Sequence, residues 1–317
     1  TAAELDAAEI ERRVTALVSQ VGGHTALFGY YLRDEPGAKA YPGLGKWTEA
    51  FRKADPESLA YINLFPNYAS PAQMDRPTYE EYVASYVEIV RPDFISYDHY
   101  ALMDDGSLRD KYFANLEIIR KTALQHDLPF WNIVLSNAHF SYAEPSPAGF
   151  RFQLYTTLAY GARGISYFTY FTPATGNYRL GPIDQFGNKK PTWDMLREVN
   201  LQLHRLGPIY ITLKSVNVFH HPDVPEGSAG IETSRFIEAL AGRDLMAGEF
   251  EDTEGRPFVM VVNKSLHHST TFGVTPKEPG KMEFINPYTG TINHWAGENN
   301  WLAPGQGMLL ALPHSSP

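Results

Sequence analysis

The chain contains no cysteine among its 317 residues. This absence excludes disulfide bonds, thiolate nucleophiles, zinc fingers and iron–sulfur clusters, and it leaves the cellular compartment undetermined. The sequence also lacks the glycine-rich motifs of phosphate-binding loops and the Gly-x-Ser-x-Gly motif of many serine hydrolases. The adjacent pairs His220–His221 and His267–His268 lack the helical spacing of metal ligands, so we expect neither a metal nor a cofactor.

Basic residues are in the minority, with 27 Lys and Arg against 36 Asp and Glu and a formal net charge of −9. Phosphate backbones and anionic headgroups do not attract a net-negative protein, so we expect no nucleic-acid and no membrane partner. No apolar run approaches the ~20 residues that cross a bilayer, and no signal-peptide pattern opens the given sequence.

Aromatic residues are abundant, at 13% of the chain, and the 19 Tyr are the commonest of them. Tyr joins an apolar ring to a hydrogen-bonding hydroxyl, which suits the C–H faces and hydroxyl rims of sugars. A Tyr-rich core is the alternative interpretation, and composition alone does not separate the two.

Short apolar runs alternate with helical patterns over residues 1–208. Strands are expected at 26–32, 59–65, 94–98, 129–135 and 164–171, and helices at 3–20, 46–54, 78–90, 110–126, 148–160 and 192–206. This alternation indicates βα units and a parallel sheet covered on both faces, which is an α/β fold.

The pattern changes over residues 209–317, where helical periodicity disappears. Short β-rich runs are expected at 216–220, 236–241, 245–251, 257–262, 269–274, 281–286 and 307–312, separated by turn residues. We therefore predict a small all-β domain, a sandwich, with the boundary at Gly207–Pro208.

Polar or aromatic residues lie at the ends of the five expected parallel strands. Such ends converge on one face, where the active sites of barrel enzymes lie. The candidates from these strand ends and from the fourth strand itself are Asp34, Glu35, Asn63, Tyr97, Asp98, His99, Tyr100, Trp131, Asn137, His139, Tyr167 and Tyr170.

Glu35 is the first candidate for catalysis. Its position at the end of a buried strand predicts lost solvation and a raised pKa, as a general acid requires. The alternative is that Asp34 or Glu35 caps the following turn or pairs with Arg33. Asp98 is the second carboxylate, a base, a nucleophile or a partner of sugar hydroxyls, unless it merely holds His99.

The segment Phe28–Leu32 followed by Asp34-Glu35-Pro36 resembles the fourth strand of the retaining (β/α)8 glycoside hydrolases. In those enzymes Asn-Glu-Pro, or a variant of it, carries the acid/base glutamate. Residues 158–170 and 184–208 resemble the last barrel strand, and the segment after it, of β-galactosidase-like members (family 42 and its relatives). Residues 261–264 and 302–307 look like the β-sandwich that closes many such enzymes.

This resemblance implies a TIM-type barrel of which strands four to eight are present, over residues 1–208, followed by a β-sandwich over 209–317. It implies a glycosidase acting on a β-glycosidic bond of an oligo- or polysaccharide, with Glu35 as the proton donor. Tyr97, His99, Tyr100 and the later candidates would then line the sugar site with Asp34 and Asn63.

The sequence departs from the family pattern in two ways. The family nucleophile is a Glu that ends the seventh strand, yet the strand at 129–135 runs into Ser136-Asn137-Ala138-His139. Either Asp98 or the weaker candidate Glu144 takes the role, or the enzyme inverts, or its activity differs. Second, five βα units cannot close an eight-stranded barrel. We therefore expect either a missing N-terminal segment or completion by a partner copy or a separate fragment.

Two alternative functions remain open. One is an endo-acting cellulase or xylanase with a groove lined by Trp47, Trp131 and Trp193. The other is a non-catalytic carbohydrate-binding protein on a decayed barrel.

Overall fold

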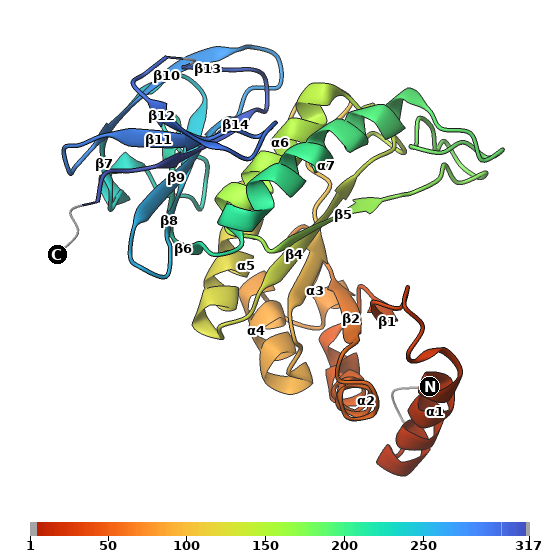
Figure 1. The fold of residues 1–317 in the computed structure, drawn as a ribbon. Coiled ribbons are helices and arrows are strands. Elements are labelled where there is room, and N and C mark those ends of the chain that lie inside the picture. Colours follow the sequence, from red (N-terminus) through yellow and green to blue (C-terminus); the bar gives the residue numbers. More distant parts are fainter. Residues whose placement is uncertain (1–4, 299, 315–317) are drawn as a thin grey trace. The chain divides into compact units, whose positions relative to one another are not determined.

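A computed structural model describes residues 5–298 and 300–314 of the chain (Figure 1). The chain divides into two compact units: Thr1–His99 with Ile118–Asn132, and Tyr100–Glu117 with Ile133–Pro317. The division falls inside the fourth strand of a sheet, so neither unit corresponds to residues 1–208 or to 209–317.

A five-stranded parallel sheet forms the first architectural layer. Its strands are β1 (Gly29–Asp34), β2 (Leu59–Leu64), β3 (Ile95–Asp98), β4 (Phe130–Leu135) and β5 (Gly164–Phe168). They are ordered β1-β2-β3-β4-β5, so that spatial order follows chain order, as successive right-handed βα connections produce. This confirms the α/β prediction, with every expected strand present.

Helices alternate with these strands. They are α1 (Ala7–Val21), α2 (Tyr41–Ala54), α3 (Pro71–Met74), α4 (Tyr79–Val90), α5 (Tyr112–Gln125), α6 (Pro147–Ala159) and α7 (Pro191–Tyr210). The side chains of Asp6, Thr78 and Ser146 cap α1, α4 and α6 by accepting backbone N–H bonds. Residues 3 and 4 of the expected first helix lie outside the described residues. No described helix is both long and apolar enough to cross a membrane.

Helix α2 begins five residues before the expected start at 46. Pro42 occupies the first turn, where proline is tolerated, and Gly43 and Gly45 follow it. A Cβ on Gly45 would lie 2.9 Å from the carbonyl oxygen of Ile89 in α4. Glycine, which normally weakens a helix, here allows α2 and α4 to pack closely.

Two antiparallel sheets follow α7. Their strands are β6 (Lys214–His221), β7 (Ile237–Gly242), β8 (Leu245–Glu251), β9 (Pro257–Asn263), β10 (Thr270–Pro276), β11 (Met282–Ile285), β12 (Ile292–Trp295), β13 (Trp301–Leu302) and β14 (Gly307–Ala311). The six-stranded sheet has the order β12-β11-β14-β9-β8-β6, and the three-stranded sheet has the order β13-β10-β7. The expected all-β region is therefore present, with the short strands β12 and β13 in addition.

The core of this β region is apolar and contains side chains from both sheets. Phe219, Val259 and Val261 from the larger sheet pack in one buried cluster with Phe272 and Leu302 from the smaller one. Such packing of two inner faces defines a sandwich. The expected boundary at Gly207–Pro208 falls inside α7, which continues to Tyr210 before β6 begins.

Helix α6 is buried on almost every side: ten of its 13 residues are buried. A helix that is apolar all round needs packing partners on both faces. One partner is α7, and the other is the sandwich, where α6 contacts β8, β9 and β14. A Cβ on Gly248 in β8 would lie only 1.9 Å from the carbonyl oxygen of Ala159, so the strand and the helix backbone touch at a point that only glycine fits.

Candidate active site

The carboxyl ends of β1, β2 and β3 place their polar side chains together in the first unit. In the parallel ladder, Asp34 on β1 is paired with Asn63 on β2, and Asn63 is paired with Ser96 on β3. Asp98 follows Ser96 by two residues, so both side chains lie on the same face of β3. The register therefore brings an amide between two carboxylates.

Hydrogen bonds connect these side chains into one network. The Asn63 side-chain nitrogen donates to Asp98 Oδ1 at 2.7 Å and to Asp34 Oδ1 at 3.2 Å. The Ser96 hydroxyl donates to Asn63 Oδ1 at 3.0 Å, and the Tyr61 hydroxyl lies 2.9 Å from Ser96 Oγ. Asn63 and Asp98 are 2% and 5% exposed and Ser96 is fully buried, so this inner part of the network is buried and hydrogen-bonded, whereas Asp34 is exposed.

Tyr31 reaches the same network from β1. Its hydroxyl donates to Asp34 Oδ1 at 2.8 Å, and its ring meets the ring of Tyr61 edge-on at 5.2 Å. Burial and the Asp34 carboxylate raise the pKa of Tyr31, so this phenol stays a hydrogen-bond donor. Tyr31 was not among the sequence candidates. Tyr31 lies three residues before Asp34, so strand alternation, which has a period of two, does not predict that the two side chains meet.

Glu35 occupies an unusual backbone conformation directly after β1. Its φ of +42° lies in the left-handed region, which costs a non-glycine residue on the order of 1 kcal/mol. Two contacts hold the conformation: the Glu35 N–H donates to the Asn63 carbonyl at 2.9 Å, and the Tyr82 hydroxyl donates to the Pro36 carbonyl at 2.8 Å. The Tyr82 hydroxyl also accepts from the Phe65 N–H at 3.3 Å. Strained residues of this kind gather at functional sites.

The electrostatics favour retention of protons in this cluster. Burial, reinforced by the charge of Asp34, raises the pKa of Glu35 to about 7. Burial and then the charge of Glu35 raise the pKa of Asp98 to about 8, against the opposing hydrogen bond from Asn63.

No ion pair reaches Asp34, Glu35 or Asp98 within the part of the chain that the structure describes. The side chains that bond to Asp34 and Asp98 are the neutral groups Tyr31 and Asn63. The ammonium of Lys39, four residues after Glu35 in the chain, is paired with Asp75 at 2.7 Å. One carboxyl that holds its proton beside one that loses it can serve as general acid and general base.

Other sequence candidates of the first unit lie around this network. Tyr97 is fully buried in β3, where strand alternation turns it away from the face that carries Ser96 and Asp98. His99 is buried and meets the ring of Tyr68 edge-on at 5.0 Å.

Trp131 belongs to an aromatic cluster of the same unit, with Phe94 at 4.9 Å, Phe28 at 5.8 Å and Tyr61 at 6.0 Å. Phe28 is 65% exposed, so this cluster opens to solvent on one side. Trp47, by contrast, packs into the separate cluster between α1 and α2.

The second unit contains the remaining candidates. The Asn137 amide donates to the Phe168 carbonyl at 2.7 Å, and its oxygen lies 3.1 Å from His139 Nδ1. The imidazole of His139 stacks on Tyr178 at 4.6 Å, and burial lowers its pKa, which favours the neutral ring. Tyr100 contacts the same ring edge-on at 6.1 Å. Both polar ends of Asn137 are therefore engaged within the protein.

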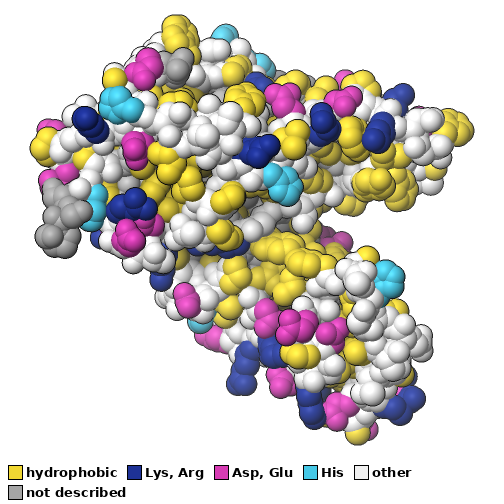
Figure 2. Space-filling view, in the orientation of Figure 1, with side chains coloured by type: hydrophobic (Ala, Val, Ile, Leu, Met, Phe, Trp, Pro, Cys, Tyr) yellow, Lys and Arg dark blue, Asp and Glu magenta, His cyan; other side chains and the backbone are white. Residues whose placement is uncertain are grey.

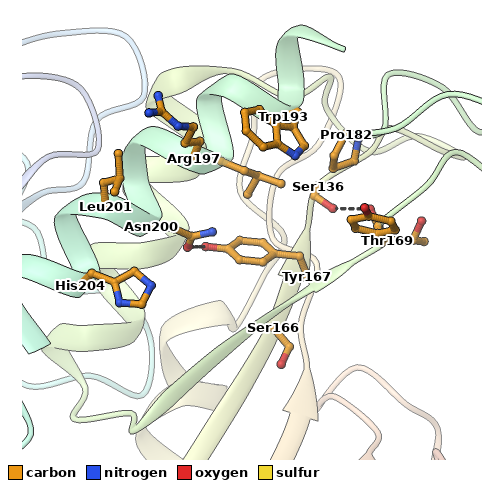
Figure 3. Close-up of a pocket in the computed structure, with 12 residues that line it drawn as sticks. Ser136, Ser166, Tyr167, Thr169, Pro182, Trp193, Arg197, Asn200, Leu201 and His204 are labelled. Carbon is orange, nitrogen blue, oxygen red and sulfur yellow. Dashed lines mark hydrogen bonds between the residues drawn. The ribbon is translucent and has the colours of Figure 1, made fainter. Parts of the chain in front are cut away.

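Tyr167 faces α7. Its hydroxyl donates to Asn200 Oδ1 at 2.8 Å, and it lines a cavity of about 530 Å³ together with Trp193 and Arg197 (Figure 3). Tyr170 also lines this cavity and is 71% exposed. Figure 2 shows hydrophobic side chains on the surface of the molecule. Phe171, in the segment after β5, is 57% exposed.

Glu144, the weaker carboxylate candidate, is exposed and forms an ion pair with Arg179 at 2.9 Å. No group of three His, Asp or Glu side chains among the described residues has the arrangement of a metal site.

The comparisons with known proteins bear on the fold. No family model and no curated protein sequence matches the chain. Among solved structures, a glycoside hydrolase is 12% identical with a TM-score of 0.57, over 97% of this chain and 69% of its own. A family 5 glycoside hydrolase from Bacteroides vulgatus is 12% identical with a TM-score of 0.56, over 96% of this chain and 66% of its own.

A β-galactosidase from a psychrophilic Marinomonas is 12% identical with a TM-score of 0.42, over 57% of this chain and 30% of its own. The chain thus spans between 30% and 69% of the lengths of these three structures. At 12% sequence identity, the similarity of these structures to the chain is evidence about the fold. The fold is a partial (β/α) barrel followed by antiparallel β sheets, shared with the two glycoside hydrolases that match over nearly the whole chain.

Proposed function

We propose that the chain carries the acid/base site of a glycoside hydrolase that cleaves a β-glycosidic bond with two carboxyl groups. Glu35 is the proton donor and Asp98 is the second carboxyl, acting as the base or the nucleophile. The single observation that supports this best is the coupled pair of raised pKa values at the carboxyl ends of β1 and β3, the two parallel strands that flank β2. The β-galactosidase-like resemblance of the sequence supports the same proposal.

Two carboxyl groups satisfy what glycoside hydrolysis requires. One protonated acid must transfer a proton to the leaving-group oxygen, while an ionised carboxylate activates water or attacks the anomeric carbon. Glu35 has no hydrogen-bond partner for its side chain among the described residues, so its proton is available to a substrate oxygen. Asp98 is held in place by Asn63.

The test uses Glu35→Gln and Asp98→Asn against a panel of nitrophenyl glycosides and polysaccharides. Each substitution keeps the shape and removes the proton transfer, so we expect turnover to fall by about 10²-fold or more with the fold intact. Circular dichroism and thermal melting check the fold. Turnover near the wild-type value in Glu35→Gln would contradict the assignment of the acid.

A second candidate is a carbohydrate-binding protein without turnover. The observation that favours it is the end of β4, which continues into Ser136-Asn137-Ala138-His139 without a glutamate. Saturable sugar binding in calorimetry, with no hydrolysis of any member of the panel, would support this candidate. Hydrolysis of long polysaccharides alone would instead favour the endo-acting cellulase or xylanase alternative.

We further propose that additional βα units complete the barrel. The outer strands β1 and β5 each have one edge without a neighbour in the described sheet, and parallel sheets are normally covered and closed. Sedimentation and intact mass of the native protein test this. We expect a polypeptide heavier than 35.6 kDa, or an oligomer. A 35.6 kDa monomer whose β5 amides are fully protected from hydrogen exchange would contradict it.

A further inference from the structure

The amide of Asn63 has an uncommon position, because both of its hydrogens face carboxylates. It donates to Asp98 Oδ1 at 2.7 Å and to Asp34 Oδ1 at 3.2 Å, from a side chain that is 2% exposed. A single side chain on β2 thus connects a carboxyl of β1 to a carboxyl of β3.

The orientation of this amide is fixed by the hydroxyl group that contacts its oxygen. Ser96, fully buried, donates its hydroxyl hydrogen to Asn63 Oδ1 at 3.0 Å. Since that hydrogen is used, Tyr61 must be the donor in the 2.9 Å contact between the Tyr61 and Ser96 hydroxyls. The relay Tyr61–Ser96–Asn63 therefore allows one orientation of the amide, with its nitrogen toward the carboxylates.

The chemistry of the donor also matters. A Lys or Arg at this place would neutralise Asp98 electrostatically and strongly favour its ionised form. An amide gives directed hydrogen bonds without a formal charge, so it fixes the geometry of Asp98 while leaving it able to take up a proton.

We infer that Asn63 is the positioning residue of the proposed site: it holds the Asp34 and Asp98 carboxyls at a fixed separation and acts on catalysis through the orientation of Asp98. Ser96 and Tyr61 in turn orient Asn63. This inference rests on the proposed function, because it gives Asp98 a role in turnover.

The groups that face Asp98 define the expected pH effect. Glu35 and Asp34, from the end of β1, raise the pKa of Asp98, whereas the Asn63 hydrogen bond lowers it. The phenols of Tyr31 from β1 and Tyr82 from α4 also interact with Asp98. Loss of the Asn63 donor leaves the other groups unchanged, so the pKa of Asp98 rises.

The experiment compares Asn63→Ala and Ser96→Ala with the wild-type chain. We expect kcat on the best nitrophenyl glycoside to fall by about 10²-fold in Asn63→Ala and about tenfold in Ser96→Ala, with KM changed less than threefold. The alkaline limb of the pH profile should move upward by at least half a pH unit. Asn217→Ala is the matched control, since it removes an amide that donates to a buried carboxylate, Glu249, in the sandwich.

Carbon-13 NMR titration of the Asp98 carboxyl, in the protein without substrate, makes the result independent of turnover. An upward shift of this pKa in Asn63→Ala, and none in Asn217→Ala, supports the structural part of the inference, namely that Asn63 holds Asp98. It does so even where the wild type cleaves no glycoside, an outcome that defeats the proposed function and the role of Asn63 in turnover. An unchanged Asp98 titration with kcat within threefold of wild type overturns the inference. Where Asn63→Ala does not fold, Ser96→Ala decides by the same readouts.

Discussion

The side-chain nitrogen of Asn63 lies 2.7 Å from Oδ1 of Asp98, the shortest hydrogen bond that Asn63 makes to a carboxyl in the described structure. Both side chains are buried, and the contact crosses from β2 to β3. This pairing holds the second carboxyl of the proposed site in place, so its protonation and that of Glu35 determine how the site responds to pH.

Turnover should have a bell-shaped pH dependence with its maximum between about 7 and about 8. Below this window both Glu35 and Asp98 hold protons, and above it both are ionised, so the form with one proton is most populated inside it. Because the pKa of Asp98 is the higher of the two, the reactive species is the smaller fraction of that form in which Glu35 carries the proton. Initial rates from pH 5 to 10 on one aryl glycoside test the prediction. A maximum near pH 5 would mean that the carboxyl pKa values are not raised.

Stability should fall as pH rises from about 4 to about 8. The folded pKa of Asp98, about 8, lies above its ordinary value of 3.8, so its contribution is full below the ordinary value and is lost as pH passes the folded one. Asp98→Asn removes the titrating group. Its Tm should therefore decline less than that of the wild type between pH 5 and 8.5, by at least about 2 °C in a melting experiment. Equal declines in both proteins would argue against a buried, protonated Asp98.

Substrate charge should matter at this site. Asp34, Glu35 and Asp98 lie together, and their side-chain partners in the described residues are neutral, so a negatively charged sugar meets uncompensated repulsion. We expect kcat/KM for an aryl glucuronide to be at least about tenfold below that of the matching neutral glucoside. Added salt should narrow the gap, since it screens the exposed part of the repulsion. Equal rates at low salt would exclude this selection.

The sandwich contains a buried carboxylate with a purely structural role. Glu249 is fully buried and accepts from Asn217 at 3.0 Å, the Ser234 hydroxyl at 2.7 Å and the N–H groups of Arg235 and Phe236, each at 2.9 Å. Glu249→Ala leaves these donors buried without an acceptor, so it should cost about 3 kcal/mol or more in urea unfolding. Glu249→Gln, which keeps part of the bonding, should cost less, and a reversed order would contradict the account.

The sequence predicted the order of strands and helices well because the parallel strands are buried apolar runs. Residues 59–65 illustrate this: the expected strand and β2 (Leu59–Leu64) agree to within one residue. The same reasoning placed Glu35 and Asp98 at strand ends. Whether they act as acid and base stays a prediction.

The parts that the sequence did not predict depend on register and on close backbone contact. Nothing in a single sequence indicates that Asn63 pairs with Ser96 across β2 and β3, so the relay behind the amide was not foreseen. Strand alternation offered a partial signal, since Ser96 shares a face with Asp98 and Tyr61 shares one with Asn63. The early start of α2 depends on Gly45 meeting the backbone of α4, a tertiary contact that helix propensity opposes.

The direct backbone contact between Gly248 of β8 and Ala159 of α6 limits where the chain can be separated into independent domains. Helix α6 belongs to two packed cores at once, since it packs on α7 and on three strands of the sandwich. If the gene were divided near codon 208, α6 and the sandwich strands that it contacts would be on separate chains, and each would expose the apolar surface that the other covers. The sandwich therefore cannot be exchanged between proteins as an independent cassette, and changes on α6 and on β8 must be inherited together.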